Sequence, residues 1–187
     1  MRDYQILPET PDQGAKIEIL LDRTFGPSRT DRTVYRLREG HPPLPDLCFV
    51  AVGEDGDFFA SLRFWPILIE ADPAILLGPL TVEPALQGRG IGKALVRHGL
   101  TAAKRLGHRL CIVVGEPSYY GPYGFRSAPE VGLILPGPVD PRRFQVLELV
   151  PDALQGIKGR IQRDERARSR RPSPEALWAA SLLSRSG

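Results

Sequence analysis

The hydrophobic positions of the chain follow two periods, and each period predicts a different kind of element. Short runs rich in β-branched and aromatic residues predict strands, whereas apolar residues spaced three or four apart predict helices. We expect a hairpin over residues 47–69 and single strands at 3–7, 74–82, 109–114, 131–135 and 144–150. Helices are expected at residues 10–26, 28–39, 91–107, 117–123 and 173–183. This order predicts a mixed α/β protein of the α+β kind, in which helices pack against a mixed sheet.

Two dipeptides refine this prediction. Asp55-Gly56 lies between the two β-rich halves of the hairpin and is typical of a tight turn. Gly78-Pro79 interrupts the strand at 74–82, and proline cannot donate a hydrogen bond to a neighbouring strand. We therefore expect a bulge or a splayed strand at this dipeptide.

Composition limits the classes of protein that remain. The 187 residues are 42% hydrophobic, which suits one globular domain with a core of its own. No apolar run reaches the roughly 18 residues that a membrane span needs, and residues 1–10 lack the apolar centre of a signal peptide. We therefore expect a cytoplasmic protein without membrane contact. Cys48 and Cys111 are expected to be buried thiols, and no spaced set of Cys and His predicts a metal site.

The net charge of +3 is unevenly distributed. Residues 158–187 hold 8 Lys and Arg against 3 Asp and Glu, which leaves 17 against 19 for residues 1–157. The sequence thus predicts a near-neutral domain over 1–157, followed by a basic linker and a C-terminal helix over 158–187. A solvated linker is the favoured interpretation of the Arg-rich run at 158–171, with contact to RNA or the ribosome as the alternative. The last helix would dock on its own domain or on a second copy, forming a homodimer.

Three glycines, Gly88, Gly90 and Gly92, stand where the strand predicted at 74–82 gives way to the helix predicted at 91–107. A helix start presents unpaired N–H groups, and glycines let an anion such as a phosphate approach them closely. The P-loop pattern fails because Gln87 and Ala94 stand where it needs a glycine and a hydroxyl residue. The dinucleotide-binding pattern fails because its third glycine is missing. A helix start without a ligand is the remaining alternative.

The stretch QGRGIG, Gln87 to Gly92, resembles the Q/R-x-x-G-x-G/A loop with which the GNAT superfamily of N-acetyltransferases binds the pyrophosphate of acyl-CoA. The stretch YYGPYGF resembles a second motif of that superfamily, in which a tyrosine, here Tyr120, stands four residues before Gly124-Phe125. The resemblance covers about residues 3–150, includes the order of elements, and is similar to the bacterial branch of predicted N-acetyltransferases. It implies a GNAT-like fold whose mostly antiparallel sheet is splayed at its centre and flanked by helices.

This resemblance also implies a reaction. An acetyl group would pass from acetyl-CoA to a primary amine by direct attack, through a tetrahedral intermediate. Tyr120 would protonate the departing thiolate, with Tyr119 or Tyr123 as substitutes. Free backbone groups beside Gly78-Pro79 would pair with the pantetheine arm and polarise the acetyl carbonyl. The cofactor contacts that the resemblance implies are Leu80, Thr81, Val82, Gln87, Gly88, Arg89, Gly90, Ile91, Gly92, Lys93, Pro117, Tyr120 and Tyr123.

One departure from the superfamily concerns the pantetheine arm. Many relatives carry an asparagine seven residues before the tyrosine, and this chain has Val113 there. Either the backbone near Gly115 and Pro117 holds the arm, or the arm lies differently.

The acceptor amine, from a small molecule or a protein, should be reached from the segment 26–46, with Phe64 and Trp65 as an apolar wall. The intact Tyr120 argues against the rival function, a non-catalytic acyl-CoA sensor. No single general base stands out: the candidates are Glu70, Asp72, Glu83 and a chain of waters.

Overall fold

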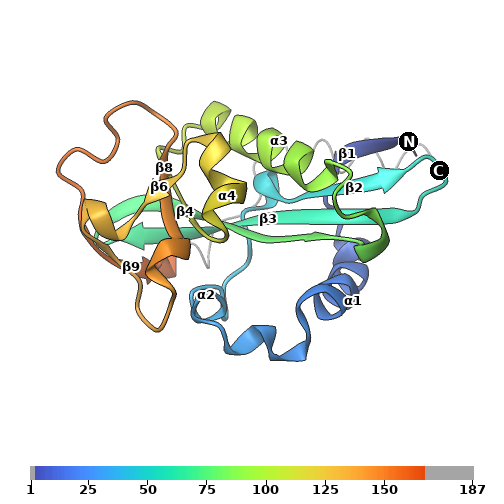
Figure 1. Ribbon diagram of the computed structural model, residues 1–187, viewed down its shortest axis with the longest axis horizontal. Helices are drawn as coiled ribbons and strands as arrows, with labels where there is room; N and C mark the ends of the chain where they lie inside the picture. The colour runs from blue at the N-terminus through green and yellow to red at the C-terminus, as the bar shows by residue number, and fades with distance from the viewer. Residues whose placement is uncertain (1–2, 167–187) are drawn as a thin grey trace.

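A mixed sheet with helices on both faces runs through residues 3–166, which are the residues that the computed structural model describes (Figure 1). Along the main path of the sheet, neighbouring strands are antiparallel except β4 (Asp72–Val82) and β5 (Leu110–Val114), which are parallel. Off this path, the short strand β7 (Leu133–Ile134) also pairs in parallel, with β9 (Gly159–Arg163). This confirms the predicted class and the mostly antiparallel sheet. The strands follow one another in the order β1 (Tyr4–Pro8), β2 (Phe49–Gly53), β3 (Phe58–Ile69), β4 (Asp72–Val82), β5 (Leu110–Val114), β8 (Phe144–Glu148) and β6 (Arg126–Ser127).

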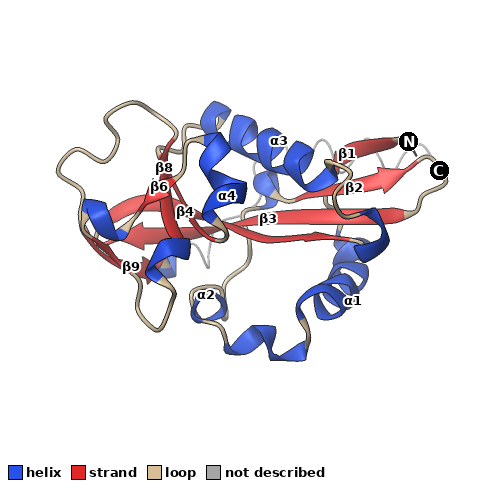
Figure 2. Ribbon diagram, viewed as in Figure 1, coloured by secondary structure: helices blue, strands red, loops and turns tan. Residues whose placement is uncertain are grey.

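Two amphipathic helices cover opposite faces of this sheet, as Figure 2 shows. Helix α3 (Ile91–Arg105) packs its buried side onto the central strands, and Gly99 lets it approach the ring of Phe64. Helix α1 (Gly14–Phe25) buries Ile17 and Leu21 on the other face. The short helix α4 (Pro117–Tyr120) lies beside α3. The site between β4 and β5 is thus bordered by one long helix on each face.

The predicted helix over residues 28–39 is wrong in its extent. The segment instead forms a 3₁₀ turn, Pro27–Asp31, and a single helical turn, α2 (Thr33–Arg36). Arg32 between them has an extended backbone, with φ −71° and ψ 143°. Tertiary contacts override the helical pattern here: beside the break, the buried Thr33 hydroxyl donates to Pro138 O at 2.6 Å.

The sheet opens at its centre. Residues Gly78 and Pro79, joined by a cis peptide bond, stand opposite the single residue Arg63, because Leu77 pairs with Phe64 and Leu80 pairs with Leu62. The ladder between β4 and β5 comprises Ile75 with Cys111 and Leu76 with Ile112, and goes no further. The predicted bulge and splay at Gly78-Pro79 are therefore confirmed.

The sheet continues past residue 157. Strand β9 (Gly159–Arg163) pairs with the end of β3 and with β7 (Leu133–Ile134), and its Ile161 is fully buried. This strand lies in the stretch predicted as linker. It has a single apolar residue within GRIQR, which is too little to show a strand pattern. The helix predicted at 173–183 and residues 167–171 of the Arg-rich run lie outside the described residues, so those parts stay predictions.

Candidate active site

The start of α3 forms a cradle of backbone amides. Gly90 caps the helix with φ 87°, and the first helical hydrogen bond runs from Ala94 N–H to Gly90 O at 2.9 Å. The N–H groups before Ala94 have no acceptor within the helix. Gly88, with φ 77°, and Gly90 both have the left-handed backbone that glycine adopts without strain, and a Cβ at either would meet no atom within 4 Å. The cradle is open, as an anion site requires.

Gly92 is needed for a different reason. A Cβ at Gly92 would lie 2.8 Å from the Tyr119 hydroxyl oxygen and 3.3 Å from Val82 Cγ2. The first turn of α3, the end of β4 and the tyrosines of α4 therefore meet at this glycine. A side chain here would collide with Tyr119 and Val82, so Gly92 serves close packing rather than turn geometry.

Strand β4 directs unpaired backbone groups into the opening. Glu83 N–H donates to Phe59 O on β3 at 2.8 Å, so alternation along the strand turns the N–H groups of Leu80 and Val82 away from β3 and toward β5. Because the ladder with β5 has ended, these donors are available to a ligand.

Thr81 departs from the role expected of it. Its backbone faces β3, and its hydroxyl donates to Thr24 Oγ1 on α1 at 2.8 Å. Both its side chain and its backbone are thus turned away from the cofactor side, because successive residues of a strand face opposite ways.

A cluster of tyrosines stands against the cradle. Tyr120 is 8% exposed and its ring contacts Tyr119 and Phe125, with centroids 4.9 and 5.7 Å apart. Burial raises the pKa of Tyr120, to which Tyr119 adds, so that the phenol keeps its proton at neutral pH. A methyl group at Gly115 would overlap the Tyr120 ring, so that glycine sets the position of the tyrosine.

The neighbouring tyrosines lie closer to the cradle itself. The Tyr123 hydroxyl donates to Lys93 O at 3.4 Å, and the Tyr119 hydroxyl adjoins Gly92. Burial raises the pKa of Tyr119 to about 12. Tyr119 was not among the predicted cofactor contacts, since only its place in three dimensions distinguishes it from its neighbours.

The remaining predicted cofactor contacts differ in whether their side chains are exposed or buried. Ile91 is buried in the core, so only its backbone can reach a ligand. Arg89 and Lys93 have exposed side chains at the mouth of the cradle, where cations would add to binding of a diphosphate. Gln87 and Pro117 are exposed as well, and Gln87 Nε2 donates to Val82 O at 3.2 Å.

Val113, which stands where many relatives carry an asparagine, is part of the sheet. Val113 is buried and pairs with Gln145 on β8. Both backbone groups of Gly115 are already bonded, the N–H to Arg143 O and the carbonyl to Gln145 Nε2, each at 2.9 Å. The Gly115 backbone therefore has no free N–H to offer the pantetheine arm, and its carbonyl already accepts a bond. This disfavours the alternative in which Gly115 holds the arm.

Comparison with known proteins agrees with this geometry. Residues 15–118, more than half of the chain, match the model of the Acetyltransferase (GNAT) family. The chain belongs to this family. It is 29% identical over 159 residues to uncharacterized N-acetyltransferase YhbS of Escherichia coli strain K12, covering 84% of this chain and 94% of YhbS. It is 31% identical over 122 residues to uncharacterized N-acetyltransferase YjhQ of the same strain, covering 63% of this chain and 67% of YjhQ.

Solved structures of the GNAT family show the same fold. The crystal structure of YhbS from Escherichia coli in complex with CoA matches with a TM-score of 0.76 at 28% identity, covering 88% of this chain and 92% of that one. A GNAT family acetyltransferase from Brucella melitensis in complex with acetyl-CoA matches with a TM-score of 0.64 at 28% identity, covering 88% and 98%. The predicted fold and the acyltransferase class are therefore confirmed.

Two further properties concern residues 3–166 of this GNAT enzyme. Over that range, His, Cys, Asp and Glu side chains do not gather in groups of three or more that suit a metal ion. Over the same range, each helix is too short or too polar to cross a membrane.

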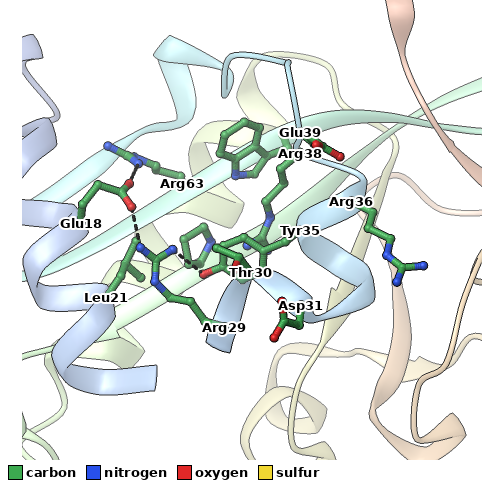
Figure 3. A pocket seen from close by; sticks show the side chains of 12 residues that line it. Glu18, Leu21, Arg29, Thr30, Asp31, Tyr35, Arg36, Arg38, Glu39 and Arg63 are labelled. Atoms are coloured by element: carbon green, nitrogen blue, oxygen red, sulfur yellow. Dashed lines mark hydrogen bonds and ion pairs between the residues drawn. The ribbon is translucent and has the colours of Figure 1, made fainter. Parts of the chain in front are cut away.

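A cavity of about 820 Å³ lies on the α1 side of the splay. Its walls come from α1, from the segment 29–39 and from β3 (Figure 3). Pro79 of the bulge also lines it. Trp65 lines it, as expected, whereas Phe64 points to the opposite face and packs against α3. The lining residues are Glu18, Leu21, Arg29, Thr30, Asp31, Tyr35, Arg36, Arg38, Glu39, Arg63, Trp65 and Pro79.

The predicted general bases lie elsewhere. Glu70 accepts the Arg160 N–H at 2.7 Å and holds the edge strand β9. Glu83 forms an ion pair with Arg23 at 2.9 Å, and Asp72 is exposed at the start of β4. Since these three carboxylates do not line the cavity, water remains as the predicted carrier of the proton from the amine.

Arginines, which the sequence analysis did not single out, dominate the cavity. Glu18 on α1 bridges Arg29 at 2.7 Å and Arg63 at 3.2 Å (Figure 3). Arg38 lies beside the bulge, where its Nη2 would be 3.2 Å from a Cβ on Gly78. Burial lowers the pKa of Arg38 to about 10, and the Tyr120 phenol is among the groups that act on it electrostatically. Arg38 therefore stays cationic at neutral pH, close to the predicted acid.

Proposed function

We propose that this GNAT enzyme transfers the acetyl group of acetyl-CoA to the primary amine of an acceptor that enters through the cavity beside α1. One observation carries the proposal. The splay between β4 and β5 brings together the amide cradle of α3, the unpaired N–H groups of Leu80 and Val82, and Tyr120. Acetyl-CoA would bind in the splay because its diphosphate suits the cradle and its pantetheine arm suits an unpaired strand edge.

The residues have separable tasks in this reaction. The first-turn amides of α3, with Arg89 and Lys93, would hold the diphosphate. An N–H of β4 at Leu80 or Val82 would donate a hydrogen bond to the carbonyl oxygen as negative charge develops on it, and one such donor contributes roughly 100- to 1,000-fold in rate. The neutral amine attacks the thioester carbon, and the tetrahedral intermediate collapses as the C–S bond breaks.

Tyr120 would complete the proton balance. The thiolate that leaves takes the phenol proton, while the amine nitrogen loses its extra proton to water, and the phenol is restored from solvent. Burial raises the pKa of Tyr120, so the acid form persists at the pH at which amines begin to lose their protons.

The test is consumption of acetyl-CoA with a panel of primary amines, followed by thiol release. We expect amine-dependent release of CoA thiol and a product heavier by one acetyl group. Binding of acetyl-CoA without turnover of any amine would favour the sensor function instead. A cytoplasmic location and an RNA contact through residues 158–171 stay predictions.

A further inference from the structure

Two hydrogen-bond donors in the acceptor cavity lack an acceptor. Arg38 Nε and Trp65 Nε1 are both buried, and neither has a hydrogen-bond partner among residues 3–166. Both residues line the cavity beside Pro79. Buried donors are almost always bonded, so two of them in one cavity indicate that a ligand supplies the acceptors.

The three inner arginines of this cavity make the contrast clear. Arg29 contacts Glu18 and Asp22 at 2.7 and 2.8 Å, and Arg63 contacts Glu9 at 2.7 Å. Arg38 is as buried as Arg29, at 8% against 7% exposure, yet within residues 3–166 it forms no ion pair. Its guanidinium instead lies over the rings of Tyr35 and Trp65, 5.0 and 6.0 Å from their centroids.

The carboxylates of the cavity do not neutralise Arg38. Glu18 is shared between Arg29 and Arg63, and Asp31 and Glu39 are exposed at the rim (Figure 3). A buried guanidinium without a counter-ion costs several kcal/mol of desolvation. That cost is offset when an anionic ligand enters.

We propose that Arg38, with Trp65 Nε1, binds a carboxylate of the acceptor, so that the acceptor of this enzyme is a small amino acid rather than a simple amine. This inference rests on the proposed acetyl transfer. A guanidinium and a carboxylate form two parallel hydrogen bonds, which fixes the orientation of the bound molecule.

The place of Arg38 sets how far the amine is from the carboxylate. A Cβ on Gly78 would lie 3.2 Å from Arg38 Nη2 and 3.7 Å from Leu80 N, so the two nitrogens are at most about 7 Å apart, the sum of those distances. Leu80 N–H is a proposed donor to the acetyl oxygen. An acceptor held by Arg38 therefore reaches the acetyl group when one or two carbons separate its carboxylate from its amine.

Matched acceptors test this directly. For several side chains, the α-amino acid, its primary amide and the amine without the carboxyl group are compared by kcat/KM. We expect the acid to be preferred at least about 100-fold, because a site built to bond a polar group rejects analogues that lack it. Arg38→Met should remove that preference and leave the amide nearly unchanged. Arg38→Lys, which keeps the charge without the fork, should retain part of it, and Arg105→Met, an exposed cation at the far end of α3, should retain all of it.

Binding without chemistry separates this inference from the proposed function. The 2-hydroxy acids of the same series, added with CoA, should raise the melting temperature of the wild type and not of Arg38→Met. Acetyl transfer to acids, amides and simple amines at equal rates, unchanged in Arg38→Met, would overturn the carboxylate site and leave the transferase standing. Equal losses for all three acceptors in Arg38→Met would show that Arg38 serves the thioester instead. Binding of hydroxy acids through Arg38 without any acetyl transfer would retain the site and reject the transferase.

Discussion

The two sides of the splay between β4 and β5 present different chemical groups. On the α3 side, backbone amides of the first helical turn and of β4 face the opening, and glycines keep them accessible. On the α1 side, long charged side chains from α1, the segment 29–39 and β3 converge on one cavity. Under the proposed function, the diphosphate common to all acyl-CoA donors would be bound by backbone amides, and the acceptor would be bound by side chains. The two sides would then differ in how substitution affects them: glycine replacement would disturb the donor side, and side-chain exchange would change the acceptor side.

The largest expected effect is the loss of acetyl-CoA affinity on substitution within the amide cradle. Gly90→Val should weaken acetyl-CoA binding at least about 100-fold, or roughly 2.7 kcal/mol, since valine does not tolerate φ 87° and its methyl groups would project over the cradle. Isothermal titration calorimetry measures this loss. The matched control is Gly107→Val, which meets a similar φ of 81° in open space beyond the other end of α3. If both variants bind acetyl-CoA equally well, the cradle is not the diphosphate site.

A second variant separates chemistry from binding. Tyr120→Phe should lower kcat about 100-fold by removing the general acid, with little change in acetyl-CoA affinity. Stopped-assay kinetics with a fixed acceptor provide the measurement, and Tyr119→Phe is the control. A larger loss in Tyr119→Phe than in Tyr120→Phe would move the acid to Tyr119.

A third pair of variants compares two buried arginines of the acceptor side. Arg29→Met should lower the free energy of unfolding by about 1–2 kcal/mol, because Asp22 and Tyr35 lose the Arg29 hydrogen bonds and Glu18 keeps only Arg63. Arg38→Met should leave it unchanged or raise it, since an unpaired buried charge is removed. Urea denaturation of the ligand-free protein measures both free energies of unfolding. An equal loss of stability in Arg38→Met and Arg29→Met would contradict the proposed difference between a paired and an unpaired buried arginine.

The smallest expected effect concerns Thr81, which was predicted to contact the cofactor but bonds to Thr24 on α1. Thr81→Val should cost about 1 kcal/mol of unfolding free energy through the lost bond to Thr24, and should leave the affinity for acetyl-CoA as it is. Parallel denaturation and calorimetry test both statements. Weakened acetyl-CoA binding would return Thr81 to the cofactor side.

Sequence reasoning succeeded where backbone geometry restricts the residue type. Gly88 and Gly90 are visible because their left-handed backbone favours glycine, and Gly78-Pro79 because proline cannot continue a ladder. It did not find Arg38, since nothing near this arginine in the chain distinguishes it from the exposed Arg36. Only packing against Tyr35, Trp65 and the bulge buries one and exposes the other. Strand β9 escaped for a related reason: an edge strand with one buried residue has almost no pattern.

The central claim is that the splay binds acetyl-CoA with its diphosphate on the first turn of α3. Diffraction from crystals grown with acetyl-CoA tests it most directly. We expect diphosphate oxygens within hydrogen-bond distance of the amides between Gly88 and Lys93, with the thioester beside Leu80 and Tyr120. A coenzyme bound elsewhere, or a cradle closed by the Tyr119 side chain with no coenzyme present, would contradict it.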